Sequence, residues 1–216
     1  MLAYTEQTAF LRLAGDATTS PSAREKVAHT FLAGSAFGRY ERTCTKLTAL
    51  GADPAALLAQ FDGLYDEYED RTPAEKWHER VLKGYVGHAV AIDFCRLAAP
   101  GLTADAAGFV AHILSEDDAS EAEEDILLRD CAADPILASR LALWGRRLMG
   151  ELLNQVSALI AAHPALERLA LAAAAAAEAN TTGATPQESK KLLTSWVFAQ
   201  LTVEHARRMD RLGLAA

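Results

Sequence analysis

Apolar residues recur at intervals of three and four along most of the chain, as at Leu82, Val86 and Ala89. This spacing is typical of one face of an α-helix, and no segment shows the strict alternation expected of a half-buried strand. The sequence therefore predicts an all-α protein. The predicted helices span 2–17, 23–50, 54–69, 72–99, 103–129, 135–162, 165–179 and 185–212.

Proline, glycine and capping residues mark where these helices begin and end. Aspartate followed by proline predicts an N-cap with proline at the first helical position, and Thr-Pro-x-Glu predicts a capping box. A glycine predicts a stop. The predicted N-caps are at Asp53-Pro54 and Asp134-Pro135, and the predicted capping boxes are Thr72–Glu75 and Thr185–Glu188. The predicted stops are Gly51 and Gly213, and residues 180–185 are predicted to be a linker.

Long helices joined by short turns pack as antiparallel neighbours in a bundle. We therefore expect an antiparallel four-helix bundle with additional C-terminal helices. The sequence shows no clear internal repeat and no sign of a second domain, so residues 1–216 are predicted to form one domain. Within it, the core bundle is expected at about 1–130 and the extra helices at about 134–212.

Composition and charge narrow the class of protein. The 216 residues are 50% hydrophobic and carry a formal net charge of −8, which argues against a strongly basic nucleic-acid binder. The three cysteines are far apart, which favours free thiols in a reducing compartment. The N-terminal residues lack the pattern of a signal peptide, and the apolar stretches are too short to span a bilayer. We expect a cytoplasmic protein without a membrane partner.

Carboxylates interrupt the apolar stripes of three predicted helices. A buried charge must be paired, bound to a metal or protonated. These carboxylates are therefore candidates for a metal site or for buried ion pairs with arginine. They are Glu6, Glu79, Asp117, Glu121 and Glu124.

Counting residues from the predicted turns shows which of these carboxylates could meet. Glu6 should face residues 32–36 of the second helix, and Glu79 should lie level with a residue near 121. Seven of the ten residues from 116 to 125 are acidic, and a run of that kind is also typical of a solvated helix face. The inward and the solvated orientations of this segment both stay open.

Several segments carry a resemblance to a known family. They are Leu2–Ala14, Gly38–Arg42, Trp77–Glu79, Ile92–Phe94, Leu141–Glu151, His205–Met209 and Leu212–Leu214. The chain resembles the bacterial ferritin-like family related to tRNA hydroxylases, which are non-haem diiron enzymes that hydroxylate an isopentenyl-type modified adenosine. Such centres take a Glu from each of two helices and Glu-x-x-His from each of the other two.

The resemblance implies a ferritin-like bundle, with Glu6 and Glu79 at iron-ligand positions. At the second-helix Glu-x-x-His this chain has Ala36 and Arg39, and the motif of the helix at 103–129 has no histidine. The guanidinium of Arg39 could then neutralise Glu6, Glu79 or a carboxylate of that helix, as a salt bridge in place of iron.

Three functions follow. The first is a ferritin-like protein of the tRNA-hydroxylase-like kind with a degenerate or absent iron site and a binding or scaffold role. The alternative is an oxygen-dependent diiron hydroxylase acting on a modified tRNA adenosine or a small molecule. A third is a pocket-binding module that uses the vacated iron site for a small ligand. The first function implies no cofactor, and the diiron hydroxylase implies two iron ions. A homodimer is one candidate partner, and tRNA is another, although the net charge gives it no support.

Overall fold

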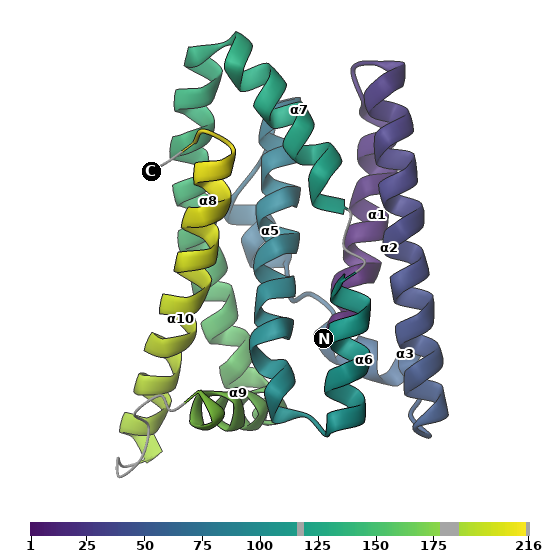
Figure 1. The fold of residues 1–216 in the computed structure, drawn as a ribbon, viewed down its shortest axis with the longest axis vertical. Helices are drawn as coiled ribbons and strands as arrows, with labels where there is room; N and C mark the ends of the chain where they lie inside the picture. The colour runs from purple at the N-terminus through teal and green to yellow at the C-terminus, as the bar shows by residue number, and fades with distance from the viewer. Residues whose placement is uncertain (116–118, 178–185, 215–216) are drawn as a thin grey trace.

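The computed structural model describes residues 1–115, 119–177 and 186–214, and these are helical throughout apart from turns and short connections. Figure 1 shows a bundle whose longest helices run roughly along one axis. This confirms the predicted all-α helical bundle. The long helices are α1 (Leu2–Thr19), α2 (Ala23–Ala49), α5 (Trp77–Ala98), α8 (Pro135–Ala162) and α10 (Pro186–Arg211).

Shorter helices connect and cover these long ones. α3 (Pro54–Leu58), the 3₁₀ turn η1 (Ala59–Phe61) and α4 (Asp66–Arg71) link α2 to α5. The turn η2 (Ala99–Gly101) leads to α6 (Ala104–Ser115), and α7 (Ala119–Ala133) precedes α8. Between α8 and α10, α9 (Pro164–Ala176) lies across one end of the bundle after a bend of 107° from α8.

α5 is the central helix of the bundle. It lies between the α1–α2 hairpin on one side and the pair α8 and α10 on the other (Figure 1). Leu82 and Phe94 of α5 belong to the same buried cluster as Leu148 of α8 and Leu201 of α10. The C-terminal helices therefore complete the main core around α5, because a helix apolar on several sides must be covered on each of them.

A separate buried contact fixes the end of α10 on α5. The guanidinium of Arg208 donates to Asp93 Oδ2 at 2.7 Å, and both side chains are largely buried. The predicted stop of this helix is confirmed, since Gly213 follows α10 with a φ of 66°. The N-cap predicted at Asp134 is confirmed too, because its side chain accepts from the amides of Ile136 and Leu137.

Two predicted helix boundaries are wrong. The helix expected at 54–69 is broken between η1 and α4, where Gly63 has a φ of 74°, which only glycine adopts readily. The capping box expected at Thr72–Glu75 does not form, because Thr72 Oγ1 donates to the carbonyl of Tyr68 and α5 begins at Trp77. Glu79 fills the capping role instead, accepting from the amide of Lys76 at 3.2 Å.

Other boundaries involve residues outside the described parts. The helix expected at 103–129 is seen as α6 and α7, which are inclined to one another in Figure 1. Residues 116–118, between them, and the linker predicted at 180–185 lie outside the described residues. Among the residues that are described, no single helix has the length and apolar character needed to cross a membrane, and the bent pair α8 and α9 meets that test only jointly.

Candidate functional site

A buried ion pair lies between α1 and α2. Arg39 Nε donates to Glu6 Oε2 at 2.9 Å, and the two residues are 1% and 0% exposed. Ala36, one turn before Arg39, is fully buried in a small cluster with Leu13 and Leu32. The predicted contact between Arg39 and Glu6 is therefore present.

His88 of α5 approaches the same carboxylate from the other side. Its Nε2 lies 3.6 Å from Glu6 Oε1, just beyond hydrogen-bond distance. Burial by itself would raise the pKa of Glu6, but the neighbouring imidazole of His88 and guanidinium of Arg39 outweigh it and lower that pKa. Glu6 is therefore held as a carboxylate inside the bundle. The helical patterning gave no signal for His88, whose place next to Glu6 depends on the packing of α1 on α5.

Glu79 lies at a different level from Glu6. It is nine residues before His88 on α5, which is about 13 Å along the helix. Its side chain pairs with Arg140 Nη2 of α8 at 2.8 Å, and its carbonyl accepts from Trp144 Nε1. The structure therefore does not bring Glu6 and Glu79 together, and Arg140 neutralises the latter.

The acidic residues predicted on the helix at 103–129 have separate surroundings. Glu121 is exposed on α7. Glu124 accepts from the Tyr85 hydroxyl and pairs with Arg211 Nη2 at 3.2 Å. Asp117 lies outside the described residues.

Glu123, which is not among the predicted candidate residues, is an acidic residue of α7 that points inward. It is 2% exposed and accepts from Arg12 Nη1 of α1 at 2.9 Å. Arg12 lies six residues after Glu6, or about 9 Å further along α1. α7 thus meets α1 about two turns away from the Arg39 and Glu6 pair.

These positions test whether the bundle fits two iron ions. Residues 1–115, 119–177 and 186–214 contain no group of three or more His, Cys, Asp or Glu side chains that could hold a metal ion. A dication at Glu6 would also lie beside the guanidinium of Arg39, and like charges repel strongly in a low-dielectric interior. The described residues therefore do not fit a two-iron centre at Glu6.

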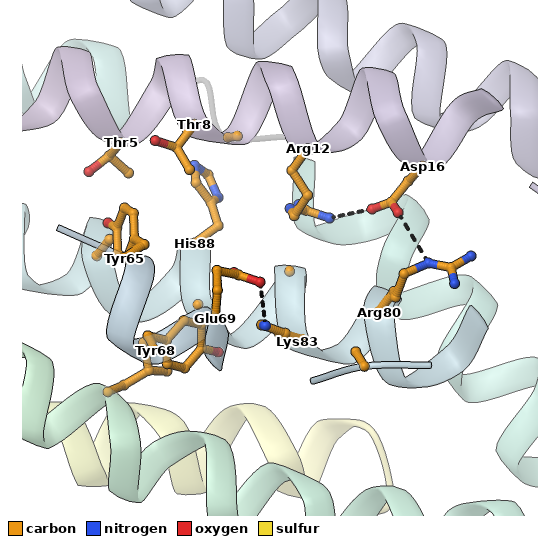
Figure 2. Close-up of a pocket in the computed structure, with 16 residues that line it drawn as sticks. Thr5, Thr8, Arg12, Asp16, Tyr65, Tyr68, Glu69, Arg80, Lys83 and His88 are labelled. Atoms are coloured by element: carbon orange, nitrogen blue, oxygen red, sulfur yellow. Dashed lines mark hydrogen bonds and ion pairs between the residues drawn. The ribbon is translucent and has the colours of Figure 1, made fainter. Parts of the chain in front are cut away.

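A pocket of about 190 Å³ adjoins the ion pair between α1, α4 and α5. His88 lines it (Figure 2), and Nε2 of the same imidazole lies 3.6 Å from Glu6 Oε1. Gly84 and Gly87 line the pocket on α5. A Cβ on Gly84 would overlap the guanidinium of Arg12, which crosses α5 at that point.

Charged side chains form one end of this pocket. Asp16 of α1 pairs with Arg12 Nη1 at 3.2 Å and with Arg80 Nε at 3.6 Å (Figure 2). Lys83 Nζ pairs with Glu69 Oε2 at 2.6 Å and donates to the carbonyl of Thr72 at 2.7 Å. The Lys83 side chain is only 9% exposed, whereas that of Glu69 is 63% exposed.

Tyrosines and apolar side chains form the rest of the wall. Tyr65 and Tyr68 line the pocket together with Ala91 and Leu152. The Lys83 ammonium lies 5.0 Å from the centroid of the Tyr68 ring, within cation–π range. Burial raises the pKa of both tyrosine hydroxyls above the usual range, so both keep their protons.

Comparison with known proteins agrees with the fold. No curated protein matches the chain. A family model described as a ferritin-like domain of actinomycetes matches residues 1–173, which include α1 to α8 and most of α9. The chain therefore belongs to the family of ferritin-like domains of actinomycetes.

Proposed function

We propose that this chain is a ferritin-like binding protein in which a buried ion pair takes the place of an iron centre and the adjoining pocket holds a small organic anion. The observation that carries the proposal is the contact between Arg39 and Glu6, since a guanidinium in hydrogen-bond contact with the buried carboxylate competes with any cation there. Descent from the tRNA-hydroxylase-like diiron family belongs to the same proposal, because that resemblance places an iron ligand at Glu6.

Lys83 supports the choice of an anion as ligand. Its ammonium is nearly buried and is fixed in the pocket wall by the carbonyl of Thr72. The carboxylate that it holds belongs to Glu69, which reaches in from the rim with most of its side chain in solvent. A pair of that kind contributes little free energy. A ligand carboxylate or phosphate could therefore replace Glu69 at Lys83 without uncovering a buried charge.

The remaining wall suits a flat or apolar body attached to that anion. Tyr65, Tyr68, Ala91 and Leu152 offer apolar surface, and the protonated tyrosines can donate hydrogen bonds. The volume of about 190 Å³ lies below the usual range for drug-sized ligands. A small aromatic carboxylate is thus a closer match to the pocket than a nucleoside.

The test is a calorimetric titration with benzoate and, separately, with inorganic phosphate. We expect Lys83→Met to weaken benzoate binding about tenfold or more, because a charge-assisted hydrogen bond is lost. Glu69→Gln should tighten binding by about twofold to fivefold, because it weakens the competing carboxylate.

Glu67→Gln is the matched control, since Glu67 lies on the same short helix and pairs with Arg71 on the surface. It should leave the affinity unchanged. Equal affinities in wild type, Lys83→Met and Glu69→Gln would overturn the anion site. Tight phosphate binding with none of benzoate would assign the pocket to a phosphate group instead.

The alternative, an oxygen-dependent diiron hydroxylase, makes an opposite prediction. Protein loaded with iron under anaerobic conditions would then hold about two irons per chain and develop a ferric charge-transfer band on exposure to oxygen. Residence in the cytoplasm and pairing of two copies stay predictions from the sequence.

A further inference from the structure

A second cavity lies at the other end of α1, where η1, η2, α6 and α9 meet the ends of α2 and α5. Its volume is about 410 Å³, within the range of small-molecule sites. None of the residues around Lys83 contributes to it. It is therefore a separate site, and the anion proposed for the first pocket has no bearing on it.

The walls of this cavity are largely apolar. Phe94 of α5, Phe109 and Val110 of α6, and Leu166 and Leu169 of α9 line it. α9 closes one side by lying directly on η2, where Gly101 is so close to Leu169 that an added Cβ would overlap the backbone. Apolar walls that do not fill their interior favour an apolar ligand, whose burial adds free energy with each methylene group.

The cavity also reaches the surface. Leu50, at the end of α2, lines it and is 64% exposed. Phe61 lines it as well, and its ring lies 4.7 Å from that of His163 at the corner between α8 and α9. A chain entering here could keep a polar head in solvent.

One lysine lies at this cavity from the side of α2. Lys46 Nζ pairs with Asp105 Oδ2 at 2.7 Å and lies 5.7 Å from the centroid of the Phe109 ring. The Asp105 side chain is 78% exposed and that of Lys46 is 28% exposed. Because the Asp105 side chain is largely in solvent, the ion pair contributes little free energy, and the Lys46 ammonium is available to an anionic head group. The methylene groups of Lys46 would then lie along the apolar wall.

We propose that this cavity binds a single-chain lipid with an anionic head, such as a fatty acid, with the chain between α5, α6 and α9 and the carboxylate at Lys46. The combination of an apolar interior with one cation at its edge is the observation behind it. A volume near the lower end of the ligand-site range favours one chain over two.

The experiment is a titration of the full chain with hexanoate, octanoate and decanoate below their micelle concentrations. We expect one site per chain and about fourfold tighter binding for each added methylene group. Lys46→Met should weaken octanoate binding about tenfold but leave 1-octanol binding unchanged. Lys26→Met is the control, since Lys26 is exposed near the other end of the same helix.

A second variant tests the cavity itself. Ala106→Trp fills the space beside α6, so it should weaken both octanoate and 1-octanol, whereas Ala111→Trp on the exposed side of α6 should weaken neither. Affinity independent of chain length, or unaffected by Ala106→Trp, would overturn the proposal. If Ala106→Trp does not fold, the chain-length series and Lys46→Met still decide.

Discussion

Replacing Arg39 with methionine tests the role of the buried ion pair in the stability of the bundle. Methionine keeps the unbranched apolar part of the side chain but removes the guanidinium that contacts Glu6. Glu6 would then be a fully buried carboxylate without that cation. The protein must then either bury the charge with only His88 beside it or protonate it, and both lower the free energy of unfolding.

The magnitude follows from the burial of both partners. Breaking a buried pair by removing one side costs about 3–5 kcal/mol, a large part of the 5–15 kcal/mol that stabilises a typical domain. With a urea slope of about 2–3 kcal/mol/M, the unfolding midpoint should fall by about 1.5 M. The control is Arg24→Met, an exposed position of the same helix, where the change should stay within about 0.5 kcal/mol.

A double variant separates the cost of an orphaned charge from the contribution of the pair. Glu6→Leu combined with Arg39→Met removes both charges, and such replacements are often neutral or stabilising by about 1–4 kcal/mol. The double variant should therefore be more stable than Arg39→Met alone. If it is less stable, the orphaned carboxylate is not the cause of the loss.

The pH dependence has a defined sign. In the wild type the pKa of Glu6 is lowered, so its contribution to stability is present above the unfolded pKa of about 4.3 and is lost as the pH falls through the lowered folded value. In Arg39→Met only His88 is left to oppose burial, so the pKa of Glu6 should be higher than in the wild type, and its carboxylate should stabilise the fold less at neutral pH. The difference between wild type and variant should thus shrink from pH 7 to pH 4. A constant difference, or a loss below about 1 kcal/mol at pH 7, would refute the reasoning.

Three further substitutions test other parts of the fold. Gly101→Ala places a Cβ against the Leu169 backbone and should destabilise by about 1–3 kcal/mol in thermal or urea unfolding. Gly108→Ala, in open space on α6, should stabilise by about 0.5–1 kcal/mol, and equal effects would contradict the close packing of α9 on η2. Burial, with a smaller effect of Arg208, lowers the pKa of His205 to about 4, so stability should fall by up to about 3 kcal/mol as the pH drops from 6.5 to 4. In His205→Gln the free energy of unfolding should depend less on pH between 6.5 and 4. An unchanged pH dependence would show that His205 does not titrate there.

Helix boundaries were predictable where a single residue sets the backbone conformation. Asp134 before Pro135 and Gly213 at the end of α10 act locally, so the sequence was sufficient. The break at Gly63 was missed because glycine inside a helical pattern is ambiguous without its φ. Thr72–Glu75 matches a capping box, but the chain turns there to carry α4 onto α8, so the threonine bonds back to Tyr68 instead.

The contact between Glu6 and Arg39 was predictable because α1 and α2 form a hairpin with a short turn. Residue counting placed the neighbour of Glu6 at 32–36, and the structure places it one turn further on. The same counting misplaced Glu79, because it treated 103–129 as one straight helix beside α5. The start of α5 also packs on α8, which brings Arg140 to Glu79, whereas His78 beside it contacts Asp130 of α7.

The residues of the pocket could not be predicted from the sequence. α5 is buried on several sides, so no apolar stripe distinguishes the side that carries Lys83 and His88. Glu69 meets Lys83, and Asp16 meets Arg80, only through the packing of other helices on α5. Helical periodicity indicates which face of a helix is apolar but not which helix covers it.

Metal analysis of protein loaded with iron under anaerobic conditions tests the central claim most directly. If the Arg39 and Glu6 pair stands in place of an iron centre, desalted protein should keep no stoichiometric iron and develop no ferric band in air. About two irons per chain, lost in Glu6→Gln, would contradict the account.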